Sequence, residues 1–530
     1  MLLRARLAIP WQQYPALGFA LALALGCAGG YSLLCYGYVL RVVPLFMASM
    51  LLLVGLVYVA FAPQVRHASR SFAWGVSMWW SVLGLWVSAL WQQADRVAIP
   101  HTPQTLVGIV TDIPRHTDTT ARVTLTLVAD SVLPIAVGRQ VSVWLQGDSV
   151  TLPKLGQAMV VSTRWRENKL YSTDSTQQVF AAWQRRQGIV AMGFAPAHAW
   201  YVLPDTTAQR LYAYLAQTAR LRLVAMEWRA RLAARYATLL RDTTALAIAQ
   251  SITLGERTLL TPRLKQLYAT AGASHVLALS GLHLGILYAV VMGLLALLPL
   301  SRGGKRGMLF VALACLWGYA WLVGFPISVV RSVLMFSLMT LARWRMEDGL
   351  SLNNLGWAAV VVLLLWPSAV ADVGFQLSFM AVLGILVGYP LLRPLRPRWP
   401  VVRWLFDALA VSACAQLAVA PLLAYHFHAL PSYFLITNLL VALLVPLMLT
   451  LGFATLVVPY APMVEALAYA FESTILCFNN ALSTIATWPH STLALTPSAW
   501  QVVLAYSFAT LGVILARAFM PQDSCVRRTH

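Results

Sequence analysis

Apolar runs of roughly twenty residues recur along this chain of 530 residues and constrain its fold more than any other feature. A helix needs roughly 20 apolar residues to cross the hydrocarbon core of a bilayer. Hydrophobic residues form 59% of the sequence and charged residues 11%, and the mean hydropathy is +0.70. One water-soluble core cannot bury this much apolar surface. The sequence therefore predicts a polytopic α-helical membrane protein.

The apolar runs predict about twelve spans. They lie near residues 15–38, 43–62, 72–91, 276–298, 308–324, 326–344, 351–366, 372–390, 404–425, 433–458, 463–487 and 499–518. Several runs contain or adjoin proline, for example Pro367, Pro421 and Pro446, which predicts that some spans are broken or re-entrant. Such pieces are tolerated at membrane depth where they face protein or a watery cavity.

Residues 99–200 have a different texture, with short alternating segments separated by Pro, Gly, Asp and Thr. The segments are TLVGIVTDI, ARVTLTLVA, RQVSVWLQG and QAMVVSTRW. Period-two alternation with β-branched residues is typical of strands. We expect a small β-barrel or sandwich, with a partly open OB-like barrel as one candidate. That fold alone does not indicate a function.

The basic residues predict the orientation of the chain, because Lys and Arg gather in cytoplasmic loops. With the amino terminus inside, alternation of the spans places every strongly basic loop on the cytoplasmic side. These loops carry Arg66, Arg70, Arg302, Lys305, Arg306, Arg343, Arg345, Arg393, Arg396, Arg398, Arg403, Arg527 and Arg528. Both termini are then cytoplasmic and the β-rich domain lies outside the cytoplasm.

A long helical pattern over residues 206–241 carries seven arginines against one acid, Glu227. A basic helix with interleaved apolar residues is typical of a membrane interface. Contact with the phosphate backbone of a nucleic acid is the alternative interpretation. The candidates for contact with lipid or DNA phosphate are Arg220, Arg222, Arg229, Arg231 and Arg235.

These patterns divide the chain into four regions. They are an N-terminal membrane segment of three helices (1–98), an extracytoplasmic β-rich, OB-like domain (99–200), basic amphipathic or interfacial helices (201–260) and a larger helical membrane domain (261–530).

Motifs that announce common enzymes are missing from the sequence. There is no phosphate-binding GxxxxGK[ST] loop, and LALSGLHLG lacks the G-x-S-x-G nucleophile elbow. On one helix, His275 and His283 would lie about 12 Å apart along the axis, too far to share a metal ion. The pair His426 and His428 has no following acid, and the cysteines show no metal spacing. We therefore expect no catalytic activity, metal or cofactor.

Polar residues inside the apolar runs are costly and are therefore candidates for function. Their alternative role is to join helices by hydrogen bonds of about 1 kcal/mol each. Ser280 and His283, at positions i and i+3, are expected to hydrogen-bond. Arg331 is the hardest to explain as a simple helix contact, because it carries a full charge. It lies either near the outer interface, after a turn at Gly324 and Pro326, or on a hydrated path for an anion.

Three stretches together identify a family. GASHVLALSGLHLGIL, PISVVRSVLM and LLLWPSAVADVGFQLSFMAVLGIL, followed by AVAPLLAYHF and TNLLVALLVP, resemble the ComEC competence family. The resemblance covers nearly the whole chain, and it implies an inner-membrane channel that passes one DNA strand into the cytoplasm during natural transformation. It implies that the recurring polar positions line a pore or gate. These are His275, Ser280, His283, Arg331, Gln376, Ser378 and Asn438.

The resemblance also implies partners: single-stranded DNA, membrane lipids, an outer DNA receptor, a cytoplasmic helicase-like ATPase and a separate nuclease. Many members of the family carry a C-terminal metallo-β-lactamase-like domain, which we expect this form to lack, because the sequence ends soon after its last apolar run. Two other functions stay open at this point. One is a secondary transporter of a small anionic or lipidic substrate, and the other is a membrane hydrolase that uses Ser280 and His283.

Overall fold

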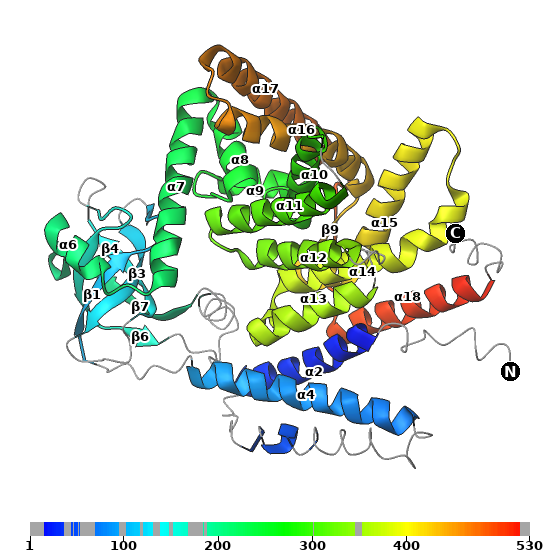
Figure 1. Cartoon of the computed structure of the whole chain (residues 1–530), viewed down its shortest axis with the longest axis horizontal. Helices are drawn as coiled ribbons and strands as arrows, with labels where there is room; N and C mark the ends of the chain where they lie inside the picture. Colours follow the sequence, from blue (N-terminus) through cyan, green and yellow to red (C-terminus); the bar gives the residue numbers. More distant parts are fainter. Residues whose placement is uncertain are drawn as a thin grey trace. The chain divides into compact units, whose positions relative to one another are not determined.

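The computed structural model describes residues 15–35, parts of 44–52, 69–94, 102–116, 120–130, 138–147, 152–167, 184, 188–299, 302–344 and 352–519. The described residues form mostly helices, with one mixed sheet and a small two-stranded sheet (Figure 1). The chain divides into two compact units. Unit 1 comprises residues Met1–Ala22, Leu232–Ala320 and Phe325–His530, and unit 2 comprises Leu23–Arg231 and Trp321–Gly324.

Six of the described helices are long and apolar enough to cross a membrane, which confirms the predicted class of membrane protein. They are Pro15–Leu33, Val373–Leu395, Pro400–Phe427, Phe434–Val457, Ala461–Ala486 and Ala499–Ala516. Five further predicted runs coincide with shorter apolar helices, at Gly75–Trp91, Gly281–Ala296, Gly307–Leu322, Ile327–Leu341 and Leu352–Leu365. The predicted span at 43–62 lies largely outside the described residues. The count of twelve spans therefore stays a prediction.

The mixed sheet of unit 2 confirms the four predicted strands. They are β1 (Gln104–Val110), β3 (Thr120–Asp130), β4 (Gln140–Gln146) and β5 (Ala158–Thr163), and the sheet also contains β2 (Arg115–His116), β6 (Arg166–Glu167), β7 (Ile189–Ala195) and β8 (Trp200–Val202). The strand order is β6-β7-β4-β3-β1-β5-β8, with β2 paired to β3. The pair β4 and β7 is parallel, whereas the other pairs are antiparallel.

The sheet follows from its alternating sequence. On β4, Val141, Val143 and Leu145 point into an apolar core, while Trp144 lies on the outer face. Two further contacts bring β5 towards β7, because Thr163 Oγ1 donates a hydrogen bond to the Phe194 carbonyl at 2.5 Å and Gly193 lies against the side chain of Thr163. These strands therefore share one apolar core.

The predicted helix over 206–241 is wrong as a single element, because the structure breaks it into α6 (Asp205–Tyr212) and α7 (Gln217–Leu239). The side chain of Arg220 donates hydrogen bonds to the carbonyl groups of Ala213 and Leu215 in this break. These carbonyls lie beyond the end of α6, where backbone acceptors lack helical partners. The next helix, α8 (Thr243–Leu254), is apolar and carries no arginine.

The remaining helices belong wholly or largely to unit 1, apart from α4 and most of α2. Their bounds are α2 (Pro15–Cys35), α4 (Ser69–Ala94), α9 (Pro262–Thr270), α10 (Gly281–Ala296), α11 (Arg302–Leu322), α12 (Ile327–Trp344), α13 (Leu352–Leu365), α14 (Val373–Leu392), α15 (Pro400–Phe427), α16 (Phe434–Val457), α17 (Ala461–Ala486) and α18 (Ala499–Phe519), with short 3-10 turns at Ala197–Ala199, Pro367–Ala371 and Arg393–Leu395. The two-stranded sheet pairs β9 (Ala429–Pro431) with β10 (Thr492–Ala494).

The core of unit 1 gathers α8, α9, α16 and α17 with the end of α7. Tyr236 on α7 is fully buried, and its hydroxyl donates a hydrogen bond to the Gly452 carbonyl of α16 at 2.9 Å. Tyr268 on α9 packs edge-on against Phe478 of α17. Aromatic contacts of this kind add to the burial of large apolar surfaces. This core supports the beginning of α10 and the beginning of α16.

Candidate functional site

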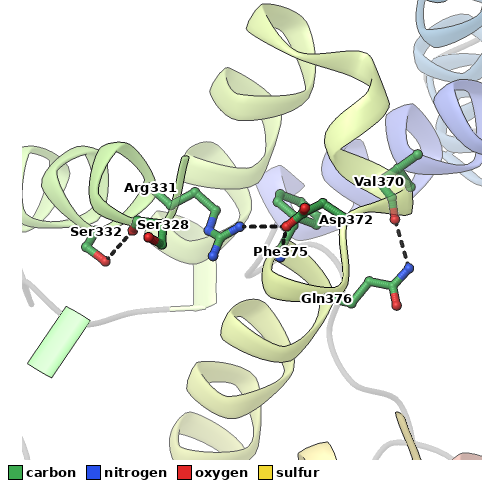
Figure 2. Close-up of polar contacts among 7 residues, drawn as sticks. All are labelled: Ser328, Arg331, Ser332, Val370, Asp372, Phe375 and Gln376. Atoms are coloured by element: carbon green, nitrogen blue, oxygen red, sulfur yellow. Dashed lines mark hydrogen bonds and ion pairs between the residues drawn. The ribbon is translucent and has the colours of Figure 1, made fainter. Parts of the chain in front are cut away.

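A buried ion pair joins α12 to the start of α14 (Figure 2). Arg331 Nη1 lies 3.5 Å from Asp372 Oδ1, and the two side chains are 4% and 25% exposed. The guanidinium also lies over the ring of Phe375, 5.9 Å from its centroid. The side chain of Arg331 is therefore enclosed by protein. A charge in apolar surroundings needs a partner of opposite sign, and Asp372 supplies it.

Asp372 has a second task, because it is the N-cap residue of α14. Its carboxylate accepts a hydrogen bond from the backbone N–H of Phe375 at 2.8 Å. Aspartate at this position satisfies one of the N–H groups that a helix start leaves unpaired. Gly374 leaves room for the pair, since a Cβ there would lie 3.0 Å from Asp372 Oδ1 and 3.6 Å from Arg331 Nη2.

One turn further along α14, Gln376 connects α14 to α15. Its Nε2 donates a hydrogen bond to the Val370 carbonyl at 2.9 Å (Figure 2), and its Oε1 lies 3.0 Å from His426 Nε2. The amide oxygen can only accept, so His426 Nε2 carries the proton in this contact. Ser378 lies half-buried on the same helix.

Asn438 connects α15 to α16, because its Nδ2 donates a hydrogen bond to Ser412 Oγ at 2.6 Å. The preceding residue, Thr437, donates to the carbonyl of Ala271 at 2.6 Å, just before the stretch that leads into α10. Gly272 has φ of +82°, and a Cβ there would lie 2.9 Å from Pro431. Both the backbone conformation and the close approach require glycine at this position.

The start of α10 is later than predicted, at Gly281 instead of residue 276, because Ser280 and His283 form a capping box there. The predicted hydrogen bond is confirmed, with Ser280 Oγ 2.8 Å from His283 Nδ1. The Ser280 backbone N–H also points to His283 Nδ1, at 3.4 Å. The N–H can only donate, which makes Nδ1 an acceptor. His275 lies outside the helix and is exposed, so the two histidines do not share a helix face.

We name as the polar seam six residues that connect helices of unit 1 in pairs: Arg331, Asp372, Gln376, His426, Ser412 and Asn438. The seam joins α12 to α14, α14 to α15, and α15 to α16. Helix α10 contacts both α16 and α12, so these five helices contact one another in a closed cycle. At the contact of α10 with α12, Gly281 lies against Ser332 and Gly285 lies against Phe336.

The structure therefore gives Arg331, Gln376 and Asn438 partners on neighbouring helices, in three separate contacts, and places Ser280 and His283 at the start of a helix of the same cycle. Sequence reasoning missed Ser412 and dismissed His426. Their signal is weak, because a serine or histidine within an apolar run becomes meaningful only when its partner on another helix is known.

Each candidate arginine of α7 has contacts within the protein. Arg220 binds the break before the helix, and Arg222 Nη1 donates to Gln140 Oε1 of the sheet at 3.3 Å. Arg229 is buried, Arg231 lies over the ring of Trp228 at 5.5 Å, and Arg235 Nη2 donates to the Val458 carbonyl at 2.9 Å. These side chains are tied to the fold, and Arg220 and Arg231 also remain exposed.

A second ion pair of unit 1 lies apart from the seam. Arg396, between α14 and α15, binds the carboxylate of Asp407 with two nitrogens, and Tyr389 donates to the same carboxylate. The hydrogen bonds to Asp407 raise the pKa of Arg396 above its ordinary value. Within the part of the chain that the structure describes, no group of three or more His, Cys, Asp or Glu side chains could hold a metal ion.

Comparison with known proteins decides the family of this chain. A family model described as Competence protein matches residues 252–519, which include α10 to α18 and all six seam residues. The chain belongs to this family of competence proteins. The match confirms the resemblance to the ComEC family that the polar motifs indicated.

Curated relatives agree with the family model. The competence protein is 30% identical over 184 residues to ComE operon protein 3 of Bacillus subtilis (strain 168), a match that covers 34% of this chain and 22% of the relative. It is 30% identical over 246 residues to Competence protein ComA of Neisseria gonorrhoeae, a match that covers 43% of this chain and 33% of the relative. It is also 26% identical over 209 residues to Uncharacterized protein YcaI of Escherichia coli (strain K12), a match that covers 37% of this chain and 26% of the relative. The matches span a third or less of each relative. No solved structure matches the chain.

Substitutions at the ion pair separate its two tasks. Asp372→Asn keeps a side-chain acceptor for the N-cap but removes the charge that Arg331 needs, and we expect a loss of about 3 kcal/mol of stability. Asp372→Ala loses the cap as well, at a further cost of about 1 kcal/mol. The double variant Arg331→Met/Asp372→Asn removes both charges and should recover most of the loss. Unfolding temperatures in detergent measure the series, and a double variant less stable than Asp372→Asn would contradict the account.

Proposed function

We propose that this protein is an inner-membrane channel that passes a single DNA strand into the cytoplasm during natural transformation. Membership of the competence family supports a role in DNA uptake. The observation that carries the finer proposal is the polar seam, which runs through a closed cycle of apolar helices. In this proposal the chain is a conduit and not an enzyme. A helicase-like ATPase, an outer receptor and a nuclease are separate partners.

The chemistry of the seam suits a polyanion that must enter and leave. Transport requires contacts that are favourable but weak and repeated. The seam contains one guanidinium, whose charge is already partly balanced by Asp372, and neutral hydrogen-bonding groups on Gln376, His426 and Asn438.

The sheet of unit 2 supports an OB-like barrel in the same proposal. Its long strands β1, β3, β4 and β7 follow one another in the sheet, β5 pairs with β1 on the other side, and Thr163 of β5 bonds to Phe194 of β7. OB-folds bind oligonucleotides on the face of their second and third strands. Here these are β3 and β4, and Arg122 lies over the ring of Trp144 on their outer face.

Phe194 extends this outer face into a row. It is 54% exposed and lies opposite Trp144 in the register of β4 and β7, while Arg122 lies opposite Trp144 in the register of β3 and β4. Side chains that are directly opposite share one face of a sheet. An arginine and two aromatic rings in a row are suited to stacking bases of a single strand. We propose that this row contacts the strand outside the cytoplasm, with both chain termini inside and about twelve spans in all.

An import assay tests the channel proposal. Labelled DNA is offered to cells in which the gene is deleted and replaced by the wild type or by Arg331→Met/Asp372→Asn, and DNA that reaches the cytoplasm is measured. The double variant leaves no unpaired charge, so we expect normal insertion but a loss of import of about tenfold or more, equivalent to about 1.4 kcal/mol.

The matched control is Arg396→Met/Asp407→Asn, which removes an ion pair outside the seam and should leave import unchanged. Normal import by the deleted strain would refute the channel role altogether. Normal import by the seam variant alone would refute the seam as its path.

A binding assay tests the row on the sheet. Phe194→Ser in the full-length protein should weaken binding of a fluorescent single-stranded oligonucleotide about tenfold, because stacking of one base on an aromatic ring contributes about 1–3 kcal/mol. Tyr201→Ser on β8 is the control, since Tyr201 is 58% exposed but lies outside the row. Equal binding by both variants would assign the strand to another surface.

A further inference from the structure

Helix α7 exposes apolar residues on one face and buries an arginine on another, the reverse of a helix in water. Leu221 and Trp228 are each 50% exposed and Val224 is 37% exposed. Arg229, on a different face, is 8% exposed. At about 100° per residue, the three apolar residues fall within roughly 60° of arc. We name them the apolar stripe of α7.

The face of α7 away from the stripe is occupied by the sheet. Leu223 is fully buried in a cluster with Ile109, Val128 and Ala158 of the sheet, and Arg222 bonds to Gln140 of β4. All of these residues belong to unit 2. The residues of the stripe therefore do not pack against the sheet, because other positions of the helix make that contact.

Helix α7 contacts the turn that joins two apolar helices. The Trp321 indole N–H, at the end of α11, donates a hydrogen bond to the Leu221 carbonyl at 3.0 Å. Gly324, in the turn between α11 and α12, lies against Met226, where a Cβ would be 2.5 Å from Met226 Cε. Turns between apolar helices of a membrane protein lie at the membrane boundary. A membrane boundary at this turn would bring this segment of α7 to the level of the lipid headgroups.

Cations flank the stripe in the manner of an interfacial helix. Arg220 and Arg231 are exposed at its edge, and the guanidinium of Arg231 lies over the ring of Trp228 at 5.5 Å. Tryptophan is enriched at the headgroup level, where its apolar ring is buried among lipid and its N–H group is hydrated. Arginine beside it can bind lipid phosphate while its stem covers apolar surface.

From these contacts we propose that residues 220–231 of α7 lie in the membrane interface. The apolar stripe enters the acyl boundary, and Arg231 binds the phosphate of an anionic lipid. The helix then anchors the sheet domain on the bilayer surface. This inference needs only a membrane and does not depend on what the chain transports.

Spin labels in reconstituted membranes test the proposal. In a variant whose six cysteines are replaced, single labels are placed at Leu221, Val224 and Trp228, and at Gln209 on α6, which is exposed, as the aqueous reference. The full chain is reconstituted in phosphatidylcholine with and without phosphatidylglycerol. Collisions with oxygen, relative to a water-soluble nickel chelate, should be severalfold higher at the three stripe positions than at Gln209.

Two results would overturn the proposal. A ratio at the stripe equal to that at Gln209 would place it in water. Low access to both reagents would place it against protein, such as a second copy of the chain. Phosphatidylglycerol should deepen the label at Val224, and Arg231→Gln should abolish that shift. A shift that persists in Arg231→Gln would refute the phosphate contact.

Discussion

The helical unit depends on how one buried charge is balanced. Arg331 is 3% exposed, and its only favourable setting in apolar surroundings is beside an anion. Asp372 provides that anion and at the same time caps α14. One carboxylate thus fixes where α14 begins and how this end lies against α12. The position of Gln376 one turn later, and its contact with His426, follow from that start.

The same constraint links structure to function. The seam combines a guanidinium with neutral amide and imidazole groups in apolar helices of a competence protein. This combination is why we interpret the seam as a path for a strand and not as packing alone.

Sequence reasoning predicted the elements more reliably than their contacts. Four strands, eleven apolar runs and the Ser280–His283 pair could be predicted because periodicity, length and i, i+3 spacing are local properties. The break in 206–241 could not, since it depends on Arg220 folding back onto the carbonyls of Ala213 and Leu215. The late start of α10 depends on a capping box that the apolar pattern of 276–298 obscures.

In the candidate site, too, local features could be predicted from the sequence, whereas contacts between distant residues could not. Arg331, Gln376 and Asn438 were predicted as polar residues in apolar runs, but their pairing with Asp372, His426 and Ser412 was not, because these partners lie 26 to 50 residues away along the chain. Which side chains meet between two helices depends on how the helices pack, and a single sequence does not show that packing. The close approaches at two glycines also depend on distant partners, because a Cβ at Gly272 would lie 2.9 Å from Pro431 and one at Gly281 would lie 3.2 Å from Ser332.

The most direct test of the channel is contact between the seam and a strand in transit. DNA with a protein bound to its trailing end is offered to cells, so that import stalls, and a photoreactive side chain is placed at Ser378, two residues after Gln376 on α14. The reference position is Phe508, 69% exposed on α18. The account predicts cross-links to DNA at Ser378 and none at Phe508. Cross-links at Phe508 alone, or at neither position while the stalled strand is held by the protein, would contradict it.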